Sequence, residues 1–188
     1  MVYDLSRYRD KSIVYSKIKY PIDSSFTCGV KSIDSMINDS FPLCIIKRSY
    51  TYEVSIKQKI VAYYRVELRN FKNNVFESLF DEYSIGSYDD LFAIHIQYIA
   101  IKECYQKHGL GNIILDHIIN VDVPCLVENC PFRLITLEGF KNLIPWYEKH
   151  NFKSLCQSLE NPETYFMIQD LVTEDDLDAL NTYNELYM

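Results

Sequence analysis

Six stretches of the chain combine β-branched and aromatic residues at a density typical of strands, several of them with apolar and polar positions in alternation. These stretches are residues 12–20, 44–53, 59–71, 91–101, 132–137 and 164–171. The short link SIKQ separates the second stretch from the third, so we expect an antiparallel hairpin there. The sequence therefore predicts a sheet of at least six strands.

Three other stretches repeat apolar residues at the spacing of a helix face. Val30 to Ile37 predicts a helix that ends at residues 40–42, and Leu110 to Val121 predicts an amphipathic helix that Pro124 breaks or kinks. Residues 142–150 predict a short helix, and residues 72–91 predict loops around one possible short helix. This order of elements predicts one mixed α/β domain over residues 1–172, followed by an acidic, helix-prone tail over residues 173–188.

Composition narrows the possible partners. The chain has 188 residues, with 48% apolar and 24% charged residues, as in ordinary globular proteins. Its formal net charge of −7 disfavours a nucleic-acid partner, because phosphate contacts need Lys and Arg, and it favours amine or cationic substrates. The N-terminal residues lack the apolar core of a signal peptide, and we expect no membrane-spanning run and a cytoplasmic location.

The cysteines and histidines do not predict a metal site. Six Cys and four His are scattered along the chain without a CxxC pair, and the closest cysteine spacing is Cys125 to Cys130. Zinc sites use characteristic short ligand spacings that are missing from this pattern. We expect reduced thiols and no metal.

Residues 106–111 (QKHGLG) carry the clearest chemical signal in the chain. They follow a predicted strand and begin a predicted helix, where backbone N–H groups lack intrahelical partners and the helix dipole adds positive charge. Gly109 and Gly111 allow the backbone to approach a phosphate without Cβ interference. We interpret the loop as a pyrophosphate site formed by the backbone of residues 107–111.

These residues resemble a known family. Ile99-Ala100-Ile101 followed by QKHGLG resembles the central motif of the GNAT superfamily of N-acetyltransferases, in which Q/R-x-x-G-x-G/A binds the pyrophosphate of acetyl-CoA. Downstream, residues 145–152 (PWYEKHNF) resemble the family segment F-Y-E-K-x-G-F. Asn151 replaces the usual Gly and also tolerates a left-handed backbone after a helix. The resemblance covers about residues 10–172 in the expected order.

A narrower resemblance concerns one branch of that family. Residues 26–37 (FTCGVKSIDSMI) resemble the F-x-C-G-x-x-x-L-D-x-x-L opening of a branch that includes toxins acetylating the amino group of aminoacyl-tRNA. Glu163 to Leu171 is similar to the end of the same branch. The resemblance implies a mostly antiparallel, twisted central sheet, splayed between strands 4 and 5 and flanked by helices on both faces.

The resemblance also implies roles for individual residues. The main chain of the fourth strand pairs with the pantetheine arm in this family, and Asn142 matches positions that contact the cofactor. The cofactor-binding residues are then Ile99, Ala100, Ile101, Gln106, Lys107, His108, Gly109, Leu110, Gly111 and Asn142. Tyr147 matches the general acid that protonates the leaving thiolate, and His95 lies where some members carry a catalytic glutamate. The alternatives are that Tyr147 only packs and that His95 is a structural histidine on a half-buried strand.

The function implied is acetyl transfer from acetyl-CoA to a primary amine, directly within a ternary complex. Two alternatives stay open at this point. The first is a toxin-type acetyltransferase acting on aminoacyl-tRNA, for which the net charge of −7 is unfavourable. The second is a non-catalytic acyl-CoA-binding module. A homodimer is compatible with the sequence, which does not identify the acceptor.

Overall fold

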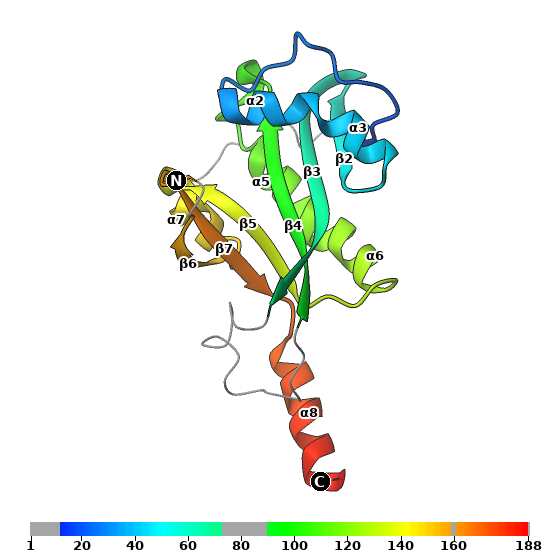
Figure 1. The fold of residues 1–188 in the computed structure, drawn as a ribbon, viewed down its shortest axis with the longest axis vertical. Coiled ribbons are helices and arrows are strands. Elements are labelled where there is room, and N and C mark those ends of the chain that lie inside the picture. The colour runs from blue at the N-terminus through cyan, green and yellow to red at the C-terminus, as the bar shows by residue number, and fades with distance from the viewer. Residues whose placement is uncertain (1–11, 73–89, 159–160, 188) are drawn as a thin grey trace. The chain divides into compact units, whose positions relative to one another are not determined.

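The protein is described by a computed structural model that covers residues 12–72, 90–158 and 161–187 (Figure 1). Its predicted hairpin turns at Lys57 and Gln58, whose φ angles are 51° and 62°. Two successive positive φ angles are the geometry of a type I′ turn, which matches the twist of paired strands. The two strands therefore pair antiparallel, from Ile56 opposite Lys59 to Tyr50 opposite Val66.

Within the described residues, seven strands form the sheet in the order β1-β2-β3-β4-β5-β7-β6, with most neighbours antiparallel and β4 parallel to β5. The strands are β1 (Ile13–Lys17), β2 (Tyr50–Ile56), β3 (Lys59–Lys72), β4 (Asp90–Ile101), β5 (Leu134–Phe140), β6 (Lys153–Gln157) and β7 (Thr164–Asp170). The α-helices are α2 (Lys31–Asn38), α3 (Ser40–Ile45), α5 (Leu110–His117), α6 (Val123–Val127), α7 (Ile144–Glu148) and α8 (Glu174–Tyr187). The predicted mixed α/β class with a mostly antiparallel sheet is confirmed.

The described chain divides into two compact units, and each has its own packing. The first comprises the described residues up to Leu68 and from Ile94 to Cys130, and the second comprises the described residues from Arg69 to Ala93 and from Pro131 onward. In the first unit, adjacent residues of β3 face helices on opposite sides of the sheet. Tyr63 packs in the cluster that includes Ile37 of α2, whereas the hydroxyl of Tyr64 donates to Asp122 at 2.7 Å, beyond the end of α5. Helices thus cover both faces, as the sequence predicted.

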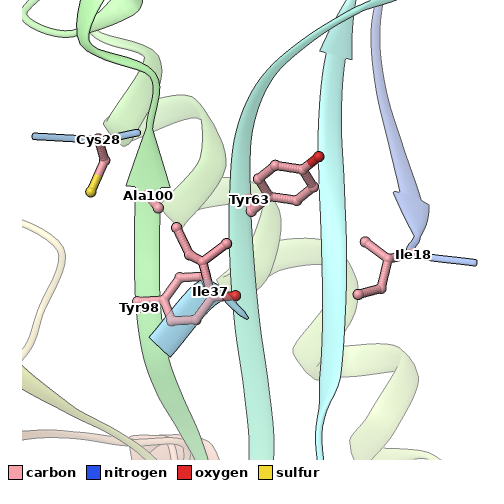
Figure 2. Packing of buried hydrophobic residues seen from close by; sticks show 6 residues of the cluster. All are labelled: Ile18, Cys28, Ile37, Tyr63, Tyr98 and Ala100. Atoms are coloured by element: carbon pink, nitrogen blue, oxygen red, sulfur yellow. The ribbon is translucent and has the colours of Figure 1, made fainter. Parts of the chain in front are cut away.

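A buried cluster fixes α2 against the sheet of the first unit (Figure 2). Tyr63 of β3 and Tyr98 and Ala100 of β4 pack with Ile37 of α2 and Cys28 of the preceding turn. The phenol of Tyr98 shares a 2.6 Å hydrogen bond with Ser40 at the start of α3. The polar end of Tyr98 is therefore satisfied while its ring fills the core.

The second unit is built on β5, β6 and β7. β5 pairs antiparallel with β7 from Leu134 opposite Asp170 to Phe140 opposite Thr164. β6 is an edge strand on the other side of β7, and the sequence did not predict it. Its burial pattern explains the omission, because only Leu155 of its five residues is partly buried. A strand with one inward residue lacks the alternation that identifies strands in a sequence.

Residues 40–45 correct another prediction. We expected a helix end at residues 40–42 and a strand from Cys44, but residues 40–45 form α3 and β2 begins only at Tyr50. Pro42 lies in the first turn of α3, where a missing N–H costs no intrahelical bond. The β-branched run at Ile45 and Ile46 favoured a strand, yet both side chains are exposed at a helix end.

The helix after the loop does not stop at Pro124. α5 continues through a π-helical turn, η4 (Ile118–Asp122), into α6. A wider turn before Pro124 accommodates the ring and the missing N–H, which would break a regular α-helix. Leu110–Val127 is thereby an 18-residue helical stretch of mean hydropathy 1.4, long and apolar enough by those criteria alone to cross a membrane. Our expectation of no such run is wrong, although Leu110, Ile114, Leu115 and Ile118 are buried as in a core helix.

The tail contains a capped helix. The Thr173 hydroxyl accepts from the N–H of Asp176, whose carboxylate accepts from the N–H of Thr173, a reciprocal capping box at the start of α8. The first turn of α8 holds three acidic residues, whose negative charges interact favourably with the positive end of the helix dipole: Glu174, Asp175 and Asp176. The predicted loops of residues 72–91 fall almost entirely outside the described residues.

Candidate active site

The loop before α5 has the backbone geometry of an anion site. A 3₁₀ turn, η3 (Glu103–Tyr105), follows β4, after which Lys107 and Gly109 adopt left-handed φ angles of 61° and 82°. The carbonyl of Gly109 accepts from the N–H groups of Asn112 and Ile113. In the part of the chain that the structure describes, the N–H groups of residues 107–111 donate no hydrogen bond. Such a run of unpaired donors at a helix start is the arrangement that binds phosphate groups.

Glycine is required at position 109 for a conformational reason. Its φ of 82° with a ψ of 0° lies in the left-handed region, which is costly for residues that carry a Cβ. Lys107 also has a left-handed φ angle, and its backbone is strained there because lysine carries a Cβ. The side chains of Lys107 and His108 are exposed, whereas Gly109 and Leu110 are buried. The backbone of the loop, and not its charged side chains, is therefore the fixed part.

Gln106 has a structural contact that the sequence did not indicate. Its Nε2 donates to the carbonyl of Cys28 at 2.7 Å and to the carbonyl of Ile101 at 2.8 Å. These residues lie 78 and 5 positions away in the sequence. The Gln106 amide thus ties the start of the loop to the end of β4 and to the turn before α2.

That turn explains the motif in residues 26–37. The carboxylate of Asp34 accepts from the N–H of Cys28 at 2.9 Å and from the Thr27 hydroxyl at 2.6 Å. Gly29 has a φ of 79°, and a Cβ there would collide with the Glu103 carboxylate. Burial raises the pKa of the Cys28 thiol to about 11. Cys28 is therefore a neutral packing residue, and the spacing of Cys28, Gly29 and Asp34 shapes the turn.

β4 presents the remaining cofactor residues of the first unit. Ile99 and Ile101 are partly exposed, whereas Ala100 between them is buried, with 1% of its surface exposed. His95, the predicted base, is 2% exposed. Two residues before Ile99, the Gln97 amide donates to the Glu67 carboxylate of β3 at 2.5 Å. This half-buried carboxylate beside β4 was not identified from the sequence, because nothing in the local pattern relates positions 67 and 97.

Tyr147 lies in α7 of the second unit, between aromatic neighbours. Its ring contacts Trp146 and Phe152 edge-on, with centroid separations of 4.6 and 5.9 Å. Burial raises the pKa of the Tyr147 phenol to about 12. The phenol therefore keeps its proton at neutral pH, as a general acid must before it acts.

Gly139 of β5 makes room for that ring. A Cβ on Gly139 would lie 2.9 Å from both Cδ2 and Cε2 of Tyr147, closer than real Cβ contacts. No turn or positive φ singles out this glycine in the sequence. Sequence reasoning missed it because its role depends on a tertiary contact with a residue eight positions away.

The end of α7 agrees with the predicted departure from the family pattern. Asn151 has a φ of 65°, the left-handed conformation that glycine adopts in the family segment. The Tyr147 carbonyl accepts from the N–H groups of His150 and Phe152, which closes the helix end. The side chain of Phe152 is 2% exposed and anchors the segment. This prediction is confirmed.

The structure groups most predicted cofactor residues in one unit. Residues 99–101 and 106–111 belong to the first unit, together with His95. Tyr147 and Asn142 belong to the second unit, where Asn142 is an exposed residue of the 3₁₀ turn η5 (Lys141–Leu143). The roles of these site residues remain predictions.

Comparison with known proteins identifies solved structures that share the fold. No family model matches the chain, and no curated protein matches it. Among solved structures, a bacterial toxin superimposes with a TM-score of 0.73 at 15% identity, over 91% of this chain and 96% of that chain. AtaT complexed with acetyl-methionyl-tRNAfMet gives 0.67 at 16% identity, over 90% and 99% of the two chains. A Tyr-to-Phe mutant of KacT gives 0.70 at 14% identity, over 89% and 98%.

The chain therefore has the fold of AtaT and KacT. The fold expected from the motif resemblance is confirmed. At these identities the similarity establishes architecture, and the activity must be argued from the residues.

Proposed function

We propose that the protein is an acetyl-CoA-dependent N-acetyltransferase that transfers an acetyl group directly to a primary amine. The observation that carries the proposal is the loop of residues 107–111, with unpaired backbone donors at the start of α5 and a left-handed Gly109. The donors suit the pyrophosphate of coenzyme A, and the adjacent main chain of Ile99 to Ile101 suits its amide-rich arm. Structural neighbours bound to acetyl-CoA support this cosubstrate.

Each group then has a defined task. The loop and the β4 main chain hold the thioester so that a neutral amine reaches its carbonyl carbon. As the C–N bond forms and the C–S bond breaks, the electron pair passes to sulfur, and the Tyr147 phenol donates its proton there. The amine nitrogen then loses a proton, which restores the phenol. His95 is the predicted base that would deprotonate the incoming ammonium to the neutral amine. Because His95 is only 2% exposed, the proton it accepts would have to pass to solvent through neighbouring buried groups.

A second candidate narrows the acceptor to the amino group of aminoacyl-tRNA. AtaT, which has this fold, was solved with acetyl-methionyl-tRNAfMet. The motif of residues 26–37, which resembles the toxin branch, is bonded through Gln106 to the cofactor loop. The excess of negative charge that argued against RNA arises in the C-terminal part of the chain, because residues 1–153 carry a net charge of +1 and residues 154–188 a net charge of −8.

A turnover screen tests the proposal. Purified protein and radiolabelled acetyl-CoA are incubated with amino acids, polyamines, aminoglycosides and methionyl-tRNA, and label is measured on the acceptor. Acceptor label is the right readout because four exposed cysteines would react with thiol reagents: Cys104, Cys125, Cys130 and Cys156.

The outcomes separate the candidates. Label on methionyl-tRNA but not on free methionine supports the second candidate, whereas label on small amines supports a small-molecule acceptor. Tight acetyl-CoA binding without label on any acceptor would point to a non-catalytic binding module.

A further inference from the structure

A buried arginine lies under α2 and α3 in the first unit. Arg65 of β3 is 5% exposed, and its Nη1 donates to the carbonyl of Met36 at 3.1 Å, near the C-terminal end of α2. Its guanidinium carbon lies 5.1 Å from the centroid of the Tyr98 ring. The carbonyl and the ring face attract a cation, but neither carries a full negative charge.

Arg65 has no acidic partner. Among the described residues it forms no salt bridge, and its Nε has no hydrogen-bond partner. The guanidinium stays charged at every physiological pH. A buried charge without a counter-charge is strongly destabilising, and a buried donor left unpaired adds its own desolvation cost.

Two buried hydroxyls, one in β2 and one just before it, are also unpaired among the described residues. Thr51 lies directly opposite Arg65 in the β2–β3 register, which brings their side chains together on one face. Thr51 is fully buried and Ser49, two residues earlier, is 2% exposed. Neither hydroxyl has a hydrogen-bond partner within the described chain.

The neighbouring polar groups do not use these donors. The Ser40 hydroxyl donates to the Met36 carbonyl at 3.3 Å, so the 2.6 Å bond between Ser40 and Tyr98 takes the phenolic proton of Tyr98. Burial raises the pKa of the Tyr98 phenol, and the nearby positive charge of Arg65 opposes this shift. Arg65 thus lies beside the Tyr98 ring, and its Nε and the Thr51 hydroxyl keep unpaired donors within the described chain.

We propose that Arg65 Nε, the Thr51 hydroxyl and the Ser49 hydroxyl form a buried binding site for a small inorganic monoanion such as chloride. One negative charge neutralises the guanidinium, whereas a dianion would replace an unpaired cation with excess negative charge in a low-dielectric interior. A spherical halide accepts from three donors without directional demands. Ordered water alone would satisfy the donors but would leave the charge of Arg65 uncompensated.

The site is separate from the residues of the acetyl-transfer proposal. Its effect is structural, because Arg65 holds the C-terminal end of α2 through the Met36 carbonyl. A ligand that binds only the folded protein raises its melting temperature in proportion to the logarithm of ligand concentration above the dissociation constant.

Thermal unfolding in sodium chloride and in sodium gluconate of equal ionic strength tests the site. The full chain is expected to melt about 3 °C or more higher in chloride, with a saturable concentration dependence. Arg65→Met should remove the difference between the salts, and Thr51→Val should reduce it. Arg48→Met, which removes an exposed charge of the same kind, should keep it. Equal melting in both salts for the wild-type protein would overturn the proposal.

If the Arg65→Met variant does not fold, a second measurement on the wild-type protein tests the anion site. Crystals of the wild-type protein soaked in sodium bromide should show an anomalous peak within hydrogen-bond reach of Arg65 Nε. Water density at that position without an anomalous signal would mean that solvent satisfies the donors, and the proposal would then be wrong.

Discussion

Gln106 is bonded to Cys28 across 78 residues of sequence, with Nε2 2.7 Å from the carbonyl oxygen. The same nitrogen donates to Ile101 at the end of β4. One side chain therefore joins the loop of the candidate cofactor site to the turn shaped by Thr27, Gly29 and Asp34. The glutamine of the loop motif and the residues of the second motif form one connected structure.

Gln106→Met should destabilise the protein and weaken acetyl-CoA binding together. The substitution keeps the length of the side chain but leaves two backbone carbonyls without their donor, at a cost of about 1–3 kcal/mol. Urea unfolding and calorimetry with acetyl-CoA measure the two effects. Gln157→Met is the control, because its Nε2 bonds the Pro162 carbonyl in an exposed position. An unchanged acetyl-CoA affinity in Gln106→Met would separate the brace from the cofactor site.

Local patterns predicted much of the fold. Alternation identified β1 and β3, a short polar link identified the hairpin, and the glycines at positions 109 and 111 identified the loop. Each signal lies within a few residues because strand and turn chemistry is local. Asn151 could be assigned a left-handed backbone for the same reason.

The missed features depend on contacts between distant residues. The brace by Gln106, the space at Gly139 and the Glu67–Gln97 bond each join segments that no periodicity relates. The predicted strand from Cys44 overlaps the last two residues of α3, because the β-branched Ile45 and Ile46 favour extended structure although the chain stays helical to Ile45. The continuation past Pro124 was missed because a π-helical turn has no sequence signature of its own.

Tyr147→Phe should reduce the turnover number about 100-fold or more while leaving the affinity for acetyl-CoA within about twofold, as loss of a general acid does. The ring packing against Trp146 and Phe152 is retained, so the stability should change little. Single-turnover acetyl transfer and calorimetry check the two quantities. Equal turnover in variant and wild-type protein would remove Tyr147 from the acid role.

Gly139→Ala should act through Tyr147. The new Cβ meets the tyrosine ring at 2.9 Å and must displace it, which lowers turnover more than cofactor affinity. The double variant with Tyr147→Phe provides the control, since displacement of a ring that lacks its hydroxyl should add little further loss of turnover. Fully multiplicative losses would mean that Gly139 affects catalysis by another route.

His117→Phe should flatten the dependence of stability on pH. His117 stacks on Tyr15 at 3.5 Å and lies 3.5 Å from the Asp122 carboxylate. Burial lowers the pKa of His117, and the charge of Asp122 only partly opposes this. As pH falls through about 6.5, the unfolded chain takes up a proton that the folded histidine resists, so stability decreases.

Phenylalanine keeps the stacking and removes this proton uptake. Urea unfolding between about pH 7.5 and pH 5.5 should therefore show a smaller loss of stability in the variant than in the wild-type protein. Both proteins keep Asp122, whose pKa is raised by burial. Parallel pH curves would show that His117 titrates alike in the folded and unfolded states.

The central claim is that the backbone of residues 107–111 binds the pyrophosphate of acetyl-CoA. Gly109→Asp tests it most directly, because aspartate places a Cβ at a φ of 82° and a negative charge beside the phosphates. Substitutions outside residues 107–111, such as Asp34→Asn or Glu67→Gln, would not test the phosphate-binding backbone of the loop. Isothermal titration calorimetry with acetyl-CoA should detect binding to the wild-type protein and none to a folded Gly109→Asp variant. Undiminished affinity in that variant would contradict the account.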